Sequence, residues 1–290
     1  MNGIVILNKE NGVYSRTAGW HVAKMFGEKK FGHIGTLDPM ASGVLLIAIG
    51  NATKMIPFIE EANDNKKEYL FGLRFGIDTD SLDITGKTIF TNDIVPNDKD
   101  ILSACNKIKQ TLEQVPPAFS AIHVNGKRAY ELARDGKKVE LKPRPIKIYD
   151  LEYTGKTTEA EYNFRVVCSR GTYVRSIVRD IAKYCGAIAT TTYIKRTKTN
   201  GFDIKNAVKL DFLENLVNNG GNINEYLMKA DCALGDIPVI NLDDKDTEFY
   251  KNGGFVKTDA NDGLVRVYSA NTFVGIGHVK DGTLHPKRTL

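Results

Sequence analysis

Short apolar runs alternate along the chain with segments whose apolar residues recur at helical spacing. Residues 4–7 and 44–49 are continuous apolar runs of the length expected for buried strands. Residues 67–75 place an apolar side chain at every second position, which is typical of a strand with one buried face. Further strands are predicted over residues 87–90, 146–153, 161–169 and 190–194. The pattern therefore predicts a protein that mixes strands and helices.

Helical periodicity predicts amphipathic helices between these strands. Ser15 is expected to cap the first helix, and Asn97 or Asp98 a second one. The turn over residues 170–172 leads into a third helix that carries Arg175 in its first turn. Because a cation in the first turn is disfavoured by the helix dipole, Arg175 is expected to have an acidic partner from elsewhere in the chain.

No metal site is predicted. The acidic segment of residues 77–83 is rich in turn formers but lacks the glycine and terminal glutamate spacing of a calcium-binding EF-hand loop. A solvated turn is therefore expected there. The four cysteines are widely separated and the five histidines form no metal-binding array. The cysteines are therefore better explained as buried thiols in a reducing compartment than as disulfides or zinc ligands.

The end of the chain is expected to form a separate small domain. Residues 218–222 are polar residues and glycines, which indicates a connecting segment near a domain boundary. We place the boundary after residue 228, which gives domains over 1–228 and 229–290. The second domain is predicted to be β-rich, with short strands at residues 237–240, 255–256, 263–268 and 272–277.

Residues 116–145 form an unusual insertion in the larger domain. Prolines lie at both of its ends, and cations such as Lys127, Arg128 and Arg144 are interleaved with aromatic residues. An ordinary solvated helix would explain much of the charge. Cations that contact phosphates beside aromatic residues that pack on bases would explain the same pattern. The sequence of this insertion leaves both interpretations open.

Length and composition indicate a globular protein with a proper core. The chain has 290 residues, of which 42% are hydrophobic and 26% charged, with a net charge of +5. This mild basic excess is compatible with a polyanionic partner without requiring one. The apolar run over 44–49 is too short for a membrane span, which needs about 20 residues. Residues 1–7 show no secretory signal, so a cytoplasmic protein is expected.

The strongest candidate for chemistry is the loop over residues 31–43, which runs into the apolar strand at 44–49. It contains three glycines and a single carboxylate, Asp38, followed by Pro39. Proline disfavours helical geometry at the residue before it, so Asp38 is expected to be held on a rigid turn. Such an acid could act chemically, or it could only organise its own turn, as most Asp-Pro loops do.

Several motifs together resemble one family, the bacterial tRNA pseudouridine-55 synthases called TruB. The loop reads Gly-His-x-Gly-x-Leu-Asp-Pro-x-Ala-x-Gly, and the insertion contains Pro-Pro-x-x-Ser-Ala and Gly-Lys-Arg-Ala-Tyr-Glu-x-Ala-Arg. Lys67-x-Tyr69, Gly171-Thr172-Tyr173-Val174-Arg175 and the Gly-Ile-Gly near the end extend the match over nearly the whole chain. One departure is Glu10 after Lys9, where the family commonly has proline.

The resemblance implies a fold and a reaction. The fold would be α+β, with a mixed, largely antiparallel central sheet, flanking helices and a small β-rich C-terminal PUA-like domain. The reaction would convert uridine 55 in the T-arm loop of tRNA to pseudouridine by flipping the base out of its stack. No redox change or group transfer occurs in this isomerisation, so no cofactor is expected. A monomer without a protein partner is expected.

The resemblance also assigns roles to residues. Asp38 would be the nucleophile, Arg175 would pair with it and keep it ionised, and Tyr69 would stack on the target base. Tyr69 would also help to remove the C5 proton after the base has rotated. Tyr173 and Ile194 would line the pocket. His33, although a tempting general base, is assigned to RNA binding together with Lys9, Lys127, Arg128 and Arg144, and the C-terminal domain to the acceptor end.

Two other functions compete with this one. A nucleotide-binding enzyme would use Gly32 and Gly35 in a phosphate loop, but the full glycine motifs are missing and Asp38 would repel phosphate. A non-catalytic RNA-binding or tRNA-folding module could use the same basic surfaces. The chemical path also stays open between attack at C1′, addition at ring C6 and an elimination.

Overall fold

The computed structural model describes residues 1–62, 66–124, 126–158 and 160–290. Asn125, which belongs to the basic insertion, lies outside the described residues. The chain divides into two compact units. The first unit consists of Met1–Pro39, Val44–Asn65 and Asn200–Leu290, and the second of Met40–Gly43 and Lys66–Thr199. The predicted boundary after residue 228 stays a prediction.

The second unit is built on an antiparallel ladder in the order β11–β12–β4–β13. The predicted alternation in β4 is confirmed, because Tyr69, Phe71, Leu73 and Phe75 are all buried. Phe71 stacks on Phe164 of the neighbouring strand with ring centroids 5.2 Å apart. The strands of this ladder are β4 (Lys67–Phe75), β11 (Ile148–Thr158), β12 (Glu161–Cys168) and β13 (Ala189–Thr199).

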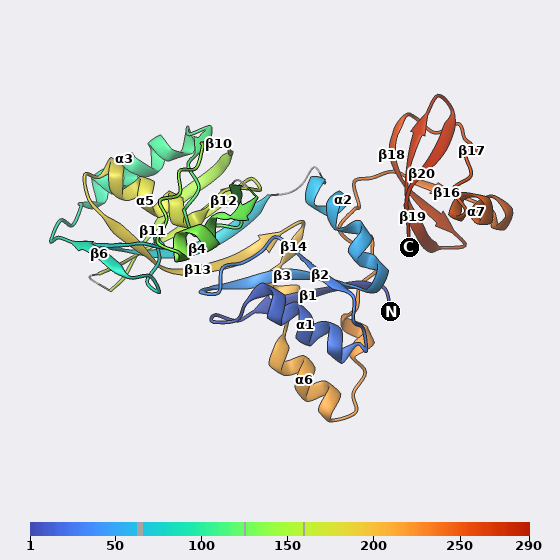
Figure 1. Cartoon of the computed structure of the whole chain (residues 1–290), viewed down its shortest axis with the longest axis horizontal. Helices are drawn as coiled ribbons and strands as arrows, with labels where there is room; N and C mark the ends of the chain where they lie inside the picture. The colour runs from blue at the N-terminus through green and yellow to red at the C-terminus, as the bar shows by residue number, and fades with distance from the viewer. Residues whose placement is uncertain (63–65, 125, 159) are drawn as a thin grey trace. The chain divides into compact units, whose positions relative to one another are not determined.

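The two longest helices of this unit, α3 (Asp98–Lys109) and α5 (Val174–Tyr184), contact each other (Figure 1). Asn97 caps α3 through its side chain, as one of the two predicted alternatives. Helix α5 has the predicted apolar face, and its Ile177, Val178 and Ile181 are fully buried. The shorter elements are β5 (Ile77–Thr79), β6 (Thr88–Thr91), β7 (Glu113–Gln114), β8 (His123–Val124), β9 (Lys127–Arg128), α4 (Ala129–Arg134) and β10 (Arg144–Pro145).

The prediction of a solvated turn at residues 77–83 is wrong. Thr79, Ser81 and Asp83 are buried, with exposed fractions of 3%, 8% and 4%. Their polar groups are satisfied inside the protein, since the Thr79 hydroxyl donates to the Asp83 carbonyl at 2.8 Å and contacts the Thr190 hydroxyl at 2.9 Å. Burial of polar groups is tolerated when they are hydrogen-bonded in this way. The segment therefore consists of β5 and a turn in which Thr79, Ser81 and Asp83 are buried while Asp80 is exposed.

The first unit holds a core made by its N-terminal strands. Ile4 and Ile6 pack with Val44, Leu46 and Ala48, as the two apolar runs predict. Helices α1 and α6 lie side by side next to β1 (Figure 1). The helices here are α1 (Ser15–Met25), η1 (Gly50–Met55), α2 (Ile56–Glu61), η2 (Ile204–Asn206), α6 (Leu210–Asn218) and η3 (Ile223–Tyr226). The strands are β1 (Gly3–Lys9), β2 (Phe31–Ile34), β3 (Ala41–Ile49), β14 (Phe202–Asp203) and β15 (Val208–Lys209).

The C-terminal residues form a mixed sheet in the order β16–β18–β19–β20–β17, as the predicted β-rich segment requires. Helix α7 (Asp244–Lys251) and strand β20 (Thr283–Thr289) were not predicted. The sequence of β20 shows no alternation typical of a strand, because it contains Pro286 and several basic residues. In the structure, a register shift beside Gly277 accommodates Pro286. The remaining strands are β16 (Val239–Asn241), β17 (Val256–Lys257), β18 (Gly263–Ser269) and β19 (Thr272–Lys280).

Gly43 permits the close approach of β3 and β13. Its φ is +105°, and a Cβ atom built there would lie 2.1 Å from the Arg196 carbonyl oxygen. Gly43→Ala should therefore lower the free energy of unfolding by more than about 2 kcal/mol, measured by urea denaturation. Gly171→Ala is the matched control, because Gly171 has a φ of +84° and no atom near its Cβ position. Equal losses in the two variants would contradict the steric explanation.

Candidate functional site

Asp38 lies on a loop that leads into β3, as the sequence motif predicts, but the loop is preceded by strand β2, which was not predicted. Its side chain is partly exposed, whereas Leu37 before it and Met40 after it are buried. The Pro39 carbonyl accepts hydrogen bonds from the Gly12 amide at 2.8 Å and from Lys9 Nζ at 3.3 Å. The loop is therefore fixed by residues 9–12, and Asp38 itself is partly exposed.

Lys9 is almost completely buried, with an exposed fraction of 1%. In addition to the Pro39 carbonyl, its ammonium group donates to the Glu10 carbonyl at 2.8 Å and to the Val13 carbonyl at 2.7 Å. A buried ammonium group is tolerated when its three donors are used in this way. Lys9 thus ties the segment after β1 to the Asp38 loop, and its predicted contact with RNA stays a prediction.

His33 lies on β2, opposite Ile47 of β3, and is partly exposed. Its Nε2 atom is 3.0 Å from the Thr36 hydroxyl, two residues before Asp38. This contact orients the imidazole within the same loop. The assignment of His33 to RNA binding stays a prediction.

Tyr69 and Ile194 lie on neighbouring strands of the second unit. Tyr69 of β4 is opposite Arg196 of β13, and Ile194 is opposite Phe71 on one side and Ala41 on the other. Tyr69 is 7% exposed and Ile194 is 5% exposed. The two predicted pocket residues therefore share one pair of strands, and Ala41 of β3 lies directly beside Ile194.

Tyr173 and Arg175 lie at the start of α5, where Tyr173 is the residue before the first helical turn. The Gln114 side chain holds the main chain of Tyr173 by two hydrogen bonds. Its Oε1 accepts from the Tyr173 amide at 2.8 Å, and its Nε2 donates to the Tyr173 carbonyl at 3.2 Å. Gln114 has an exposed fraction of only 4%, and sequence analysis did not identify it.

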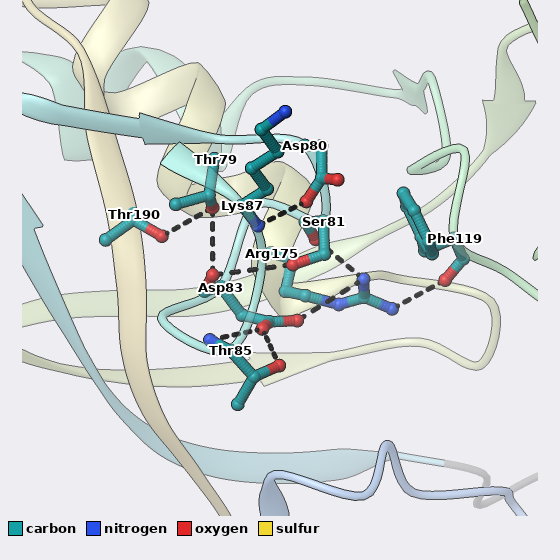
Figure 2. A network of polar contacts seen from close by, with 9 residues as sticks. All are labelled: Thr79, Asp80, Ser81, Asp83, Thr85, Lys87, Phe119, Arg175 and Thr190. Carbon is teal, nitrogen blue, oxygen red and sulfur yellow. Dashed lines mark hydrogen bonds and ion pairs between the residues drawn. The ribbon is translucent and has the colours of Figure 1, made fainter. Parts of the chain in front are cut away.

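Arg175 is 3% exposed, and Figure 2 shows its side chain between the loop of Ser81 and Asp83 on one side and Phe119 on the other. Nη1 donates to the Ser81 carbonyl at 2.8 Å and Nη2 to the Phe119 carbonyl at 2.9 Å. Nη1 also lies 3.7 Å from Oδ2 of Asp83. The expected acidic partner from elsewhere in the chain is therefore confirmed, and it is Asp83.

The second carboxylate oxygen of Asp83, which does not face Arg175, is fixed by hydrogen bonds. Its Oδ1 accepts from the Thr85 amide at 3.0 Å and from the Thr85 hydroxyl at 2.5 Å. A carboxylate with these bonds is oriented before it meets the guanidinium. Sequence analysis missed Asp83 because it interpreted the whole acidic segment as solvated. The available signal was an acid followed two residues later by threonine, which is typical of a local side-chain turn.

The cations of the insertion lie on the surface, as both interpretations of this segment require. Lys127, Arg128 and Arg144 are all exposed. Lys127 and Arg128 form β9, which pairs with His123 and Val124 of β8, and the Arg128 guanidinium donates to the Ala121 carbonyl. Arg144 belongs to β10, which pairs with β7 and so joins the two ends of the insertion.

Three of the four cysteine thiols are not activated as nucleophiles. Burial raises the pKa of Cys105 to about 11 and the pKa values of Cys168 and Cys232 to about 12. At neutral pH these side chains are therefore protonated, and a thiol attacks far less readily than a thiolate. Within the described residues, no group of three or more His, Cys, Asp or Glu side chains could hold a metal ion. None of the helices described here is long and apolar enough to cross a membrane.

The chemistry available in these two units is that of carboxylate, phenol and guanidinium groups. The first unit presents Asp38 on a fixed loop, together with Lys9 and His33. The second unit presents Tyr69 beside Ile194, and Tyr173 with Arg175 on α5. A carboxylate on a fixed loop can act as a nucleophile or a base toward an electron-poor centre.

Comparisons with known proteins point to one family. The chain matches the family model "TruB family pseudouridylate synthase (N terminal domain)" over residues 23–174 and "Pseudouridine synthase II TruB, C-terminal" over 238–290. It is 38% identical to the tRNA pseudouridine synthase B of Clostridium kluyveri, covering 97% of this chain and 96% of that protein. The enzyme of the same name from Caulobacter vibrioides is 35% identical, covering 100% of this chain and 96% of that protein.

The fold agrees with solved structures at lower sequence identity. A chain in the crystal structure of a Cbf5–Nop10–Gar1 complex superimposes with a TM-score of 0.71 and 20% identity, covering 99% of this chain and 84% of that chain. The predicted fold, a mixed and largely antiparallel sheet with a β-rich C-terminal part, is therefore confirmed. Family models and relatives over the full length lead to one assignment. The chain belongs to the TruB family of pseudouridylate synthases.

Proposed function

We propose that this protein converts uridine 55 in the T-arm loop of tRNA to pseudouridine, with Asp38 as the nucleophile. The observation that carries the proposal is the similarity over the whole chain to proteins called tRNA pseudouridine synthase B. The fixed loop that presents Asp38 supports it, because the chemistry requires an anionic group held in one place.

The reaction is an isomerisation that needs no external reactant. The bond from N1 to C1′ of uridine breaks, the base rotates, and a bond from C5 to C1′ forms. The proton on C5 leaves, and N1 gains a proton, so atoms and electrons balance. In each of the three open paths the Asp38 carboxylate acts on the sugar or the ring, as a nucleophile at C1′ or C6 or as a base in the elimination.

In this proposal the residues of the second unit form the remainder of the pocket. Tyr69 stacks on the extruded base and helps to remove the C5 proton, while Tyr173 and Ile194 line the walls. Arg175 contacts Asp38 as well as Asp83 and keeps the nucleophile ionised.

RNA contacts outside the pocket would stabilise the flipped state. Extruding a stacked uridine costs a few kcal/mol, and cations that bind phosphates can offset that cost. Lys127, Arg128 and Arg144 are exposed and suited to this role on the T-arm, with His33 and Lys9 near the displaced loop. The domain over residues 229–290 would hold the acceptor end. The protein would act as a monomer in the cytoplasm.

Position mapping on tRNA tests the proposal. An unmodified tRNA transcript is incubated with the protein, and pseudouridines are located by carbodiimide labelling and primer extension. A single stop at position 55 is expected, and a transcript with cytidine at position 55 should give none. A stop at another uridine would overturn the assignment of position 55. RNA binding without any stop would favour the tRNA-folding module.

A further inference from the structure

Ser15 makes an unusual contact with the residue before Asp38. Its hydroxyl oxygen donates to the Leu37 carbonyl at 2.9 Å and accepts from the Leu37 amide at 3.0 Å. One side-chain atom therefore satisfies both main-chain polar groups of Leu37. Both residues have an exposed fraction of 4%, so solvent does not compete for these hydrogen bonds.

The contact replaces the role that the sequence predicts for Ser15. We expected Ser15 to cap α1, but the cap position is occupied by Tyr14, whose side chain makes no capping hydrogen bond. Serine caps stabilise helices by about 0.5–2 kcal/mol, so a helix that begins without one gives up local stability. Departures from local preference of this kind occur most often at functional sites.

The residue after Asp38 is fixed from the same segment of the chain. The Pro39 carbonyl accepts from the Gly12 amide and from Lys9 Nζ, as described above. The main chain on both sides of Asp38 is thus attached to residues 9–15. Ser15 supplies the whole attachment on the Leu37 side among the hydrogen bonds described, whereas Pro39 has two donors.

We propose that Ser15 is a positioning residue that fixes the direction of the Asp38 side chain through the main chain of Leu37. This inference rests on the proposed role of Asp38 as the nucleophile. Rotating the Leu37 carbonyl would turn the peptide that leads into Asp38 and move its carboxylate. A displacement of about 1 Å at a reacting group can cost on the order of 100-fold in rate.

The test measures the rate of the chemical step for Ser15→Ala, Ser15→Thr and Thr53→Val. A T-arm stem-loop with tritium at C5 of the target uridine is used in trace amounts with saturating protein, and tritium release is followed in a single turnover. At saturation an unfolded fraction lowers the amount of active protein without changing the rate constant. Thr53→Val is the matched control, since the Thr53 hydroxyl also donates to a main-chain carbonyl, that of Gly50, at 2.8 Å in the same unit.

We expect Ser15→Ala to lower the single-turnover rate constant about 10–100-fold while the dissociation constant for the stem-loop changes less than about threefold. Thr53→Val should keep the wild-type rate, and Ser15→Thr should regain most of it because its oxygen is retained. Hydrogen–deuterium exchange gives a second readout, in which the peptide over residues 34–40 should exchange at least about tenfold faster in Ser15→Ala.

Three results would overturn the inference. A wild-type rate constant in Ser15→Ala would show that Leu37 needs no fixing for catalysis. Equal slowing in Thr53→Val would show that any lost hydroxyl in this unit has the same effect. Unchanged exchange over residues 34–40 would show that Ser15 does not hold this loop. A wild type without tritium release would instead overturn the proposed function, and the positioning role with it.

Discussion

Asp38→Asn should reduce pseudouridine formation at least about 1,000-fold, which corresponds to roughly 4 kcal/mol of transition-state stabilisation. Asparagine has the same shape and can keep the loop conformation, but its amide is neither a nucleophile nor a base. Binding of the T-arm stem-loop should change less than about threefold, because the phosphate contacts proposed for the insertion are untouched. The expected result is therefore loss of chemistry with retention of the complex.

Single-turnover tritium release and filter binding measure the two quantities separately. Glu10→Gln is the matched control, because Glu10 is exposed beside the same loop and the substitution also removes one negative charge. Glu10→Gln should keep the wild-type rate of tritium release. If Asp38→Asn lost binding and rate in parallel, Asp38 would be a binding residue, and the nucleophile assignment would be wrong.

Asp83→Asn should lower the free energy of unfolding by about 3 kcal/mol, at the low end for breaking a buried ion pair. The substitution removes the negative charge of Asp83 from beside the buried guanidinium of Arg175, and the loss of this charge pair is the source of the cost. The loss is moderated because Nη1 and Nη2 of Arg175 keep the carbonyls of Ser81 and Phe119. Asparagine can also still accept from Thr85.

Urea denaturation followed by circular dichroism measures this loss. Asp80→Asn is the control, since Asp80 lies in the same loop and is exposed, and its carboxylate accepts from the Lys87 amide at 2.9 Å. Asp80→Asn should lower the free energy of unfolding by less than about 1 kcal/mol, as is usual for surface charges. Equal losses for Asp80→Asn and Asp83→Asn would contradict the structural role of the buried pair.

Hydrophobic patterning predicts most of the second unit and much of the first. The alternation in residues 67–75 identifies a half-buried strand, and the apolar face after residue 173 identifies α5. Both patterns are local, since burial on one face leaves a periodic trace in the sequence. The motif around Asp38 is also local, so its place on a loop that leads into a buried strand could be predicted, whereas strand β2 before the loop could not.

Polar residues whose partners are distant in sequence could not be placed. Asp83 meets Arg175 across 92 positions of the chain, and nothing near Asp83 distinguishes a buried acid from a solvated one. Ser15 has the sequence context of a helix cap, but its partner Leu37 is 22 residues away. Nothing in the sequence distinguishes Lys9 from a surface cation, and one of the carbonyls that hold its ammonium group, that of Pro39, is 30 residues away.

The most direct test of the account follows tritium release from a T-arm stem-loop labelled only at C5 of the uridine equivalent to position 55. With wild-type protein we predict release of one tritium per RNA and a product nucleoside that co-elutes with pseudouridine. With Asp38→Asn we predict a bound RNA that keeps its label. No release by the wild type, or equal release by both proteins, would contradict the account.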